Sequence, residues 1–173
     1  MSEIVHHDET VTAIRFADDG AIPNSRLPLL VYPEAVPGAD ATPEVMEGLL
    51  EIGGWPPRWR SVIFTYHHYH STAHEVLAVA SGSAEVMMGG PQGEELMISA
   101  GDVIVIPAGV GHKRLSSTSD FLVVGGYPPG ADWDLLRGEP CERPMADENI
   151  ARVPKPDTDP VLGASGPLLE LWV

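Results

Sequence analysis

Residues 68–82 read HYHSTAHEVLAVASG, and this stretch decides the fold. His68 and His70 stand at positions i and i+2, so their side chains point to the same face of a β-strand. Glu75 follows the second histidine by five residues, which allows a tight turn to bring its carboxylate back beside the two imidazoles. The stretch therefore predicts two neighbouring strands whose polar side chains converge on one pocket.

A second stretch, GDVIVIPAGVGH at residues 101–112, supplies a third imidazole. Its apolar run predicts another strand, and the sequence Pro-Ala-Gly at 107–109 predicts a loop that returns His112 toward the same pocket. An isolated histidine is more often an ordinary core or surface residue than a ligand. Three imidazoles and one carboxylate at these spacings instead favour a site for a divalent metal ion with coordination positions left open.

Short apolar runs separated by turn residues recur about every 8–12 residues between positions 61 and 126. This spacing predicts an antiparallel sandwich or a small barrel. The run at 62–68 is predicted to be a strand that places Val62 and Phe64 on the pocket side, as a floor below His68.

The first stretch resembles the first motif of the cupins, which runs G-x5-H-x-H-x3–4-E-x6-G. His68, His70, Glu75 and Gly82 match it, and Val62 stands where the leading Gly is usual. This departure concerns backbone packing and leaves the ligand positions intact.

The second stretch resembles the second cupin motif, G-x5-P-x-G-x2-H-x3-N. Gly101, Pro107, Gly109 and His112 match it, and Ser116 stands where Asn is usual. The two motifs together cover about residues 62–116.

The resemblance implies an all-β fold: an antiparallel double-stranded β-helix (the jelly-roll or cupin barrel) with a few short flanking helices. It also implies that His68, His70, Glu75 and His112 are the ligands of one divalent transition metal ion, which could be Fe, Mn, Ni, Cu or Zn. A homodimer is expected on the same ground. The tail at residues 142–154 is similar to that of small single-domain bacterial cupins of unassigned function.

Cupins include dioxygenases, isomerases, decarboxylases, binding proteins and storage proteins, so the fold does not give the reaction. The favoured hypothesis is a metal-dependent enzyme of the dioxygenase type that acts on a small oxygen-bearing molecule. A redox-neutral isomerase or lyase is the alternative within enzymes. A non-catalytic cupin that binds a small molecule is the alternative outside them.

Two further residues are candidates for contact with a substrate. Tyr66 shares the predicted pocket face with His68, where its phenol could donate to a bound oxygen; a core aromatic is the alternative. Arg114 lies two residues after His112 and could hold an anionic substrate; a salt bridge at the barrel rim is the alternative. His74 is turned away from the pocket by strand alternation, and a turn or surface position is expected for it.

The whole chain, residues 1–173, is predicted to form one domain. Its parts are a metal-binding barrel core at about 61–126, N-terminal strands and a helix at 10–54, and a C-terminal extension at 127–173. Residues 55–60, WPPRWR, could form a lid or a dimer contact, but ordinary surface packing is favoured.

Several local patterns in the flanks predict helices. Thr42 is a good N-cap before an apolar stripe that Gly53 ends. Short helices are predicted at 132–136 and 146–151. Residues 168–172 could return as a last strand or cover the barrel.

The composition argues against several classes of partner. The formal net charge of −15 argues against nucleic acid or an anionic membrane surface as a partner. No apolar run reaches the roughly 18 residues of a membrane span, and the N-terminus lacks the features of a signal peptide. The lone Cys141 fits a reducing compartment. A cytoplasmic protein with a small-molecule ligand is therefore expected.

Overall fold

The computed structural model describes all 173 residues. The strands are β1 (Ser2–His7), β2 (Thr12–Phe16), β3 (Ser25–Tyr32), β4 (Pro57–Ser61), β5 (Glu75–Ser81), β6 (Ser83–Met88), β7 (Glu94–Ser99), β8 (Val103–Ile106), β9 (His112–Ser117) and β10 (Leu122–Gly126). The helices are α1 (Pro43–Ile52), α2 (Met145–Arg152) and α3 (Leu168–Leu171), with 3-10 turns η1 (Gly38–Asp40) and η2 (Pro140–Glu142). None of the helices has the length and apolar character needed to cross a membrane.

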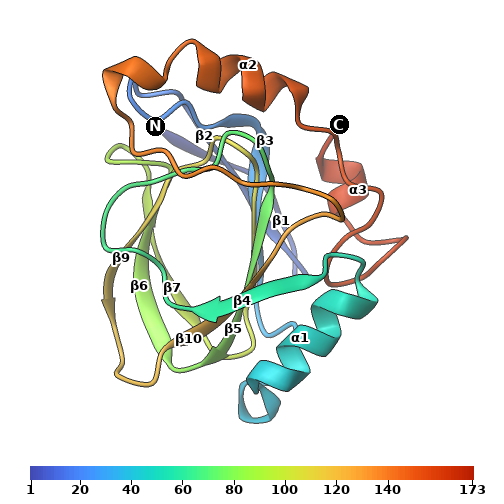
Figure 1. The fold of residues 1–173 in the computed structure, drawn as a ribbon. Coiled ribbons are helices and arrows are strands. Elements are labelled where there is room, and N and C mark those ends of the chain that lie inside the picture. The colour runs from blue at the N-terminus through green and yellow to red at the C-terminus, as the bar shows by residue number, and fades with distance from the viewer.

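The strands form two sheets that face one another across the barrel (Figure 1). The larger sheet has the order β1-β2-β3-β8-β5-β10-β4, and the smaller has the order β7-β6-β9. Every pairing within them is antiparallel. The predicted all-β jelly-roll class with a few short helices is confirmed. The N-terminal strands take part in the larger sheet, so the barrel extends beyond the segment 61–126.

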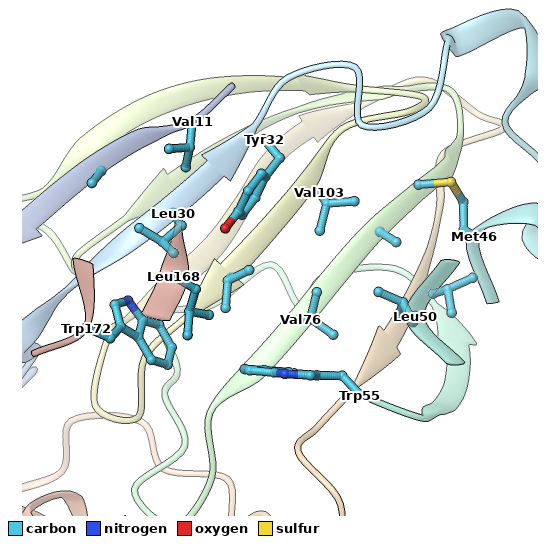
Figure 2. Packing of buried hydrophobic residues seen from close by; sticks show 14 of the residues in the cluster. Val11, Leu30, Tyr32, Met46, Leu50, Trp55, Val76, Val103, Leu168 and Trp172 are labelled. Atoms are coloured by element: carbon cyan, nitrogen blue, oxygen red, sulfur yellow. The ribbon is translucent and has the colours of Figure 1, made fainter. Parts of the chain in front are cut away.

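The two central strands β5 and β8 are buried on both faces, which explains their nearly continuous apolar sequences. On the inner face, Leu77 of β5 belongs to one core cluster with Val86 of the smaller sheet. On the outer face, Val76 belongs to a second cluster with Leu50 of α1 and Trp172 beside α3 (Figure 2). The larger sheet is thus covered on one side by the smaller sheet and on the other by helices.

The helix predicted after Thr42 is confirmed as α1. The Thr42 hydroxyl oxygen accepts a hydrogen bond from the backbone N–H of Val45 at 3.1 Å, and Gly53 caps the other end. Met46 and Leu50 form its buried face against the larger sheet.

The segment 62–67 is not a strand, and this prediction is wrong. β4 belongs to the larger sheet, and the chain then crosses to the smaller sheet, where His68 pairs with His112. A segment that changes sheets keeps no single neighbour, so strand alternation does not hold along it. Val62 and Phe64 are consequently 41% and 47% exposed, at the mouth of a cavity rather than on its floor.

The C-terminal extension differs from prediction at one place. The helix predicted at 146–151 is confirmed as α2, and residues 168–171 form α3, which covers the barrel instead of adding a strand. The predicted helix at 132–136 is absent because Leu136 exchanges two backbone hydrogen bonds with Tyr69, both of 2.9 Å. That pairing fixes an extended backbone at Leu136.

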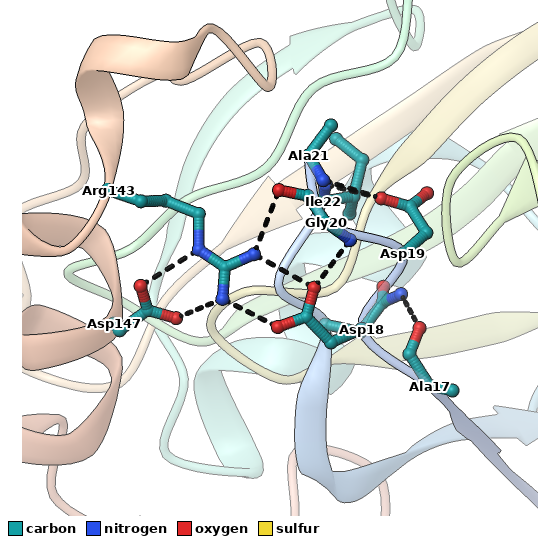
Figure 3. A network of polar contacts seen from close by, with 9 residues as sticks. Ala17, Asp18, Asp19, Gly20, Ala21, Ile22, Arg143 and Asp147 are labelled. Atoms are coloured by element: carbon teal, nitrogen blue, oxygen red, sulfur yellow. Dashed lines mark hydrogen bonds and ion pairs between the residues drawn. The ribbon is translucent and has the colours of Figure 1, made fainter.

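One guanidinium joins α2 to the loop between β2 and β3 (Figure 3). Arg143 donates from Nε to Asp147 at 2.8 Å and from Nη1 to Asp18 at 2.8 Å. The bonds from Arg143 hold the pKa of both carboxyl groups below its ordinary value. The contact ties the C-terminal extension to the N-terminal strands.

Candidate metal centre

A cavity of about 310 Å³ contains all four predicted ligands, which are His68, His70, Glu75 and His112. The rest of its lining is mostly apolar or aromatic and consists of Trp59, Ser61, Val62, Ile63, Phe64, Leu77, Tyr127, Trp133 and Leu135. No Lys or Arg lines it. The volume is near the lower end of ligand pockets, which start at about 300 Å³, so the cavity suits a small molecule.

The three imidazoles lie close enough together to share one ion. His68, His70 and His112 each offer a ring nitrogen, and these nitrogens all lie within 4.8 Å of one another. All three residues are buried. Two backbone hydrogen bonds between His68 and His112, of 3.2 and 2.9 Å, hold these two residues side by side.

The hydrogen bonds around the rings decide which nitrogen faces the cavity. Each ring bonds through Nδ1 to a backbone carbonyl, which can only accept, so each Nδ1 carries a proton. The pairs are His68 with Tyr66 at 3.0 Å, His112 with Val110 at 3.1 Å, and His70 with Asp134. The Nε2 atoms are left to bind a metal, and outer hydrogen bonds of this kind are typical of metal-ligating histidines. The residues therefore fit a divalent transition metal ion.

Glu75 completes the set from the start of β5. Its Oε2 lies 3.1 Å from Nε2 of His70, and its Oε1 lies 3.2 Å from Nε2 of His112. Burial opposes ionisation of this carboxyl group, but the two imidazoles outweigh it and hold the Glu75 pKa well below the usual range. Burial likewise opposes charging of His70, yet Glu75 raises the His70 pKa to about 8. A metal ion would displace the proton that the His70 Nε2 holds.

Three aromatic side chains lie beside Glu75. One of them, Trp59, lines the cavity, so the surface packing favoured for residues 55–60 is wrong for this residue. The Tyr127 hydroxyl donates to Oε2 of Glu75 at 2.8 Å and accepts from Nε1 of Trp59 at 2.9 Å. Trp133 stacks on the Tyr127 ring, with centroids 4.1 Å apart. Tyr127 could have been predicted to face the pocket, because strand alternation from the inward-facing Val123 continues past two glycines to Tyr127. Trp133 lies in an irregular loop and carries no such signal.

The two predicted substrate contacts, Tyr66 and Arg114, do not line this cavity. The Tyr66 ring stacks on Phe64 with centroids 5.0 Å apart. The Arg137 guanidinium lies over the same Tyr66 ring, 3.8 Å from its centroid. Arg114 donates from Nε to the carbonyl of Ile63 at 3.0 Å. Arg114 thus stabilises the segment that crosses between the sheets. Tyr66 lies in that segment, so strand alternation does not set the direction of its side chain.

His74 is buried, whereas a turn or surface position was expected for it. It is 2% exposed, and its ring packs on Trp172 with centroids 4.7 Å apart. Its Nδ1 accepts from the backbone N–H of Ala108 at 2.9 Å. Burial lowers the His74 pKa to about 4. The expectation that the His74 side chain points away from the pocket is right, because His74 does not line the cavity that contains Glu75.

Comparisons with known proteins agree with the motifs. Residues 60–123 match the family model described as "Cupin domain". The chain is 43% identical over 159 residues to the uncharacterized protein YjlB of Bacillus subtilis (strain 168), a match that covers 91% of this chain and 94% of YjlB.

Two solved structures are more distantly similar. A DUF861 family protein from Thermotoga maritima is 23% identical, with a TM-score of 0.33, over 50% of this chain and 91% of that one. Acireductone dioxygenase from Bacillus anthracis, with a cadmium ion in its active centre, is 17% identical, with a TM-score of 0.34, over 65% and 56%. Likenesses this weak carry no information on function.

Proposed function

Because the chain belongs to the cupin family, we propose that it is a metal-dependent enzyme of the dioxygenase type that acts on a small oxygen-bearing molecule. The observation that carries the proposal is the shared orientation of three buried imidazoles, each bonded through Nδ1 to a backbone carbonyl. A metal ion would take their Nε2 atoms and displace the proton on His70, beside the ionised carboxylate of Glu75. His68, His70, Glu75 and His112 would hold the ion. A redox-active divalent ion with open positions would bind the substrate oxygen atoms and activate O2.

The side chains around the proposed ligands would choose the substrate. With no Lys or Arg in the lining, nothing but the metal ion offers positive charge to an anionic oxygen. Trp59, Phe64 and Trp133 present aromatic surface to the remainder of the molecule. We propose a substrate with a small apolar or aromatic body and two neighbouring oxygen atoms that can bind the metal together.

Tyr127 holds a proton at a defined place beside the proposed centre. Burial raises its pKa above the ordinary value, and the negative charge of Glu75 adds to this shift, so the hydroxyl stays protonated. Its single proton is directed to Glu75 and its oxygen accepts from Trp59. Tyr127 is therefore proposed to orient the Glu75 carboxylate rather than to act as a base.

The parts of the chain outside the two motifs belong to the same proposed unit. Trp133 and Leu135 of the C-terminal extension line the cavity together with Trp59 of β4. We therefore propose that residues 1–173 form one domain. A cytoplasmic location and a homodimer are proposed from the composition and the cupin resemblance, and light scattering of the purified protein would test the dimer.

The test starts from untagged protein purified without chelators, analysed for Fe, Mn, Ni, Cu and Zn. One equivalent of a redox-active ion is expected. O2 uptake is then followed with catechols, β-diketones and 2-hydroxy acids of increasing apolar size, and one O2 should be consumed per substrate molecule. Turnover with Zn(II) in the absence of O2 would replace this proposal by the isomerase or lyase. Tight binding of these molecules without turnover under any metal would replace it by the binding protein.

A further inference from the structure

A second cavity, of about 470 Å³, contains the buried His74 in its lining. Its other walls come from β2 and β3, the loop after β8, and α2 with the segment that follows it. The Asp, Arg and Lys residues of the lining are Arg15, Asp18, Arg26, Asp147 and Lys155. Not one of these residues lines the cavity with the three histidines.

His74 lines this cavity and carries a buried ring N–H that has no hydrogen-bond partner. Its Nδ1 accepts from the N–H of Ala108 at 2.9 Å, so the neutral ring must carry its proton on Nε2. The Nε2 atom is buried and has no hydrogen-bond partner. The Pro154 backbone is close enough to favour a charged ring, but it does not complete a hydrogen bond of normal geometry. Buried donors are rarely left without an acceptor.

Three cationic side chains lie around the same cavity, in a chain with 10 Lys and Arg against 25 Asp and Glu. Arg15 is partly engaged, because its Nε donates to the carbonyl of Arg26 at 2.9 Å and Glu3 lies 4.0 Å away. The Arg26 guanidinium and the Lys155 ammonium form no ion pair. Both are exposed, so they can meet a ligand at the cavity rim.

Two carboxylates also line the cavity, and they share one guanidinium. Asp18 and Asp147 bind the guanidinium of Arg143 from its two sides (Figure 3). One guanidinium offsets one of the two negative charges, so this cluster keeps a net charge of −1. Arg26 and Lys155 together carry +2, so a net charge of +1 remains for a ligand.

We propose that this second cavity binds a small organic anion. An oxygen of its carboxylate or phosphate group would accept from Nε2–H of His74, and Arg26 and Lys155 would neutralise its charge. Phe16, Leu27 and Ile150 line the cavity with apolar surface for the rest of the molecule. The volume exceeds what one inorganic anion fills, which is why the ligand is expected to be organic. The proposal does not depend on the metal centre.

The test is a titration of the full chain, labelled with nitrogen-15, at constant ionic strength. Inorganic phosphate represents a phosphorylated ligand, and hexanoate represents a carboxylated one with an apolar body. At least one probe should shift the Ala108 amide and the His74 ring signals in a saturable way. Saturation by phosphate alone identifies the phosphate class, saturation by hexanoate alone identifies the carboxylate class, and saturation by both supports their shared oxyanion chemistry.

The variant for this titration is Arg26→Gln with Lys155→Gln, two exposed positions where folding is not at risk. Binding should weaken at least about tenfold, since each charged hydrogen bond alone is worth about that factor. The matched control is Lys113→Gln with Arg152→Gln, which removes the same charge from two cations that do not line the cavity. Equal weakening in both variants, or no saturable shift with either probe, would overturn the proposal.

Discussion

His74 and Glu75 are consecutive residues, yet each lines a different cavity, and the two cavities are built in opposite ways. In the cavity of Glu75, the carboxylate meets two imidazoles and a hydroxyl, and every histidine has its outer nitrogen fixed by a carbonyl. In the cavity of His74, one ring nitrogen and two cations have no partner. The first arrangement fits an ion, whereas the second leaves one buried N–H and two exposed cations available to a ligand.

The largest expected effect is on the first cavity. His68→Ala combined with His112→Ala removes two of three imidazoles, so metal content should fall from about one equivalent to below about a tenth, because such sites need three or four protein ligands. Elemental analysis of the folded variant measures this. The control is His67→Ala, which changes a neighbouring histidine outside the cavity. Retention of stoichiometric metal by the double variant would show that the ligand assignment is wrong.

Tyr127→Phe should weaken metal binding without abolishing it. Loss of the hydroxyl frees the Glu75 carboxylate to turn, and outer-shell partners of this kind are worth about 10–100-fold in metal affinity. Competition with a chelator measures the affinity of the metal alone. Tyr32→Phe is the matched control, because Tyr32 is equally buried and its hydroxyl binds Asp159 away from both cavities. Equal affinities for both variants would remove the positioning role of Tyr127.

His74→Ala should leave the metal content unchanged and should reduce the stability of the fold. The variant leaves a void beside Trp172 and an unsatisfied N–H at Ala108, which together should cost about 2–4 kcal/mol of unfolding free energy. Urea unfolding monitored by circular dichroism gives the cost. Loss of the metal from this variant would show that the two cavities are not independent of one another.

The smallest effect concerns the contact of Arg143 with Asp18 and Asp147. Arg143→Met should lower the unfolding free energy by about 1 kcal/mol, a figure kept small because both carboxylates are partly exposed. Arg143 depresses the pKa of both carboxyl groups below the ordinary 3.8. Their contribution is therefore present above pH 3.8 and is lost as the pH falls through the lowered values. The stability difference between parent and variant should close on acidification, and a constant difference would contradict the ion pair.

The gathering of the four proposed ligands around one cavity was predictable because its information is local. His68 and His70 are two residues apart, Glu75 follows one turn later, and only His112 had to be brought from a distance. Even for His112, the Pro and Gly residues at 107–109 predicted the loop that brings the chain back to the pocket. The class of the fold followed from the same repetition of short apolar runs and turns.

The failures share a physical cause, which is contact with distant parts of the chain. Alternation gave the direction of His74 but not its burial, because Trp172 covers its ring from nearly a hundred residues away. Tyr66 was placed by assuming a regular strand where the chain changes sheets, whereas Arg114 lies in β9 and donates to the carbonyl of Ile63 on that distant crossing segment. Trp133 reaches the cavity of Glu75 from a loop with no periodic pattern. A position set by tertiary packing alone leaves no trace in local spacing.

The four tryptophans divide into two pairs that experience different surroundings. Trp59 and Trp133 line the cavity of Glu75. Trp55 and Trp172 lie together in the core cluster on the outer face of the larger sheet, with ring centroids 6.4 Å apart. A paramagnetic ion such as Cu(II) quenches the fluorescence of nearby indoles most strongly. Loading the centre should therefore extinguish the emission of the first pair ahead of that of the second. The protein would carry its own optical probe of metal occupancy together with an internal reference, and neither requires a label.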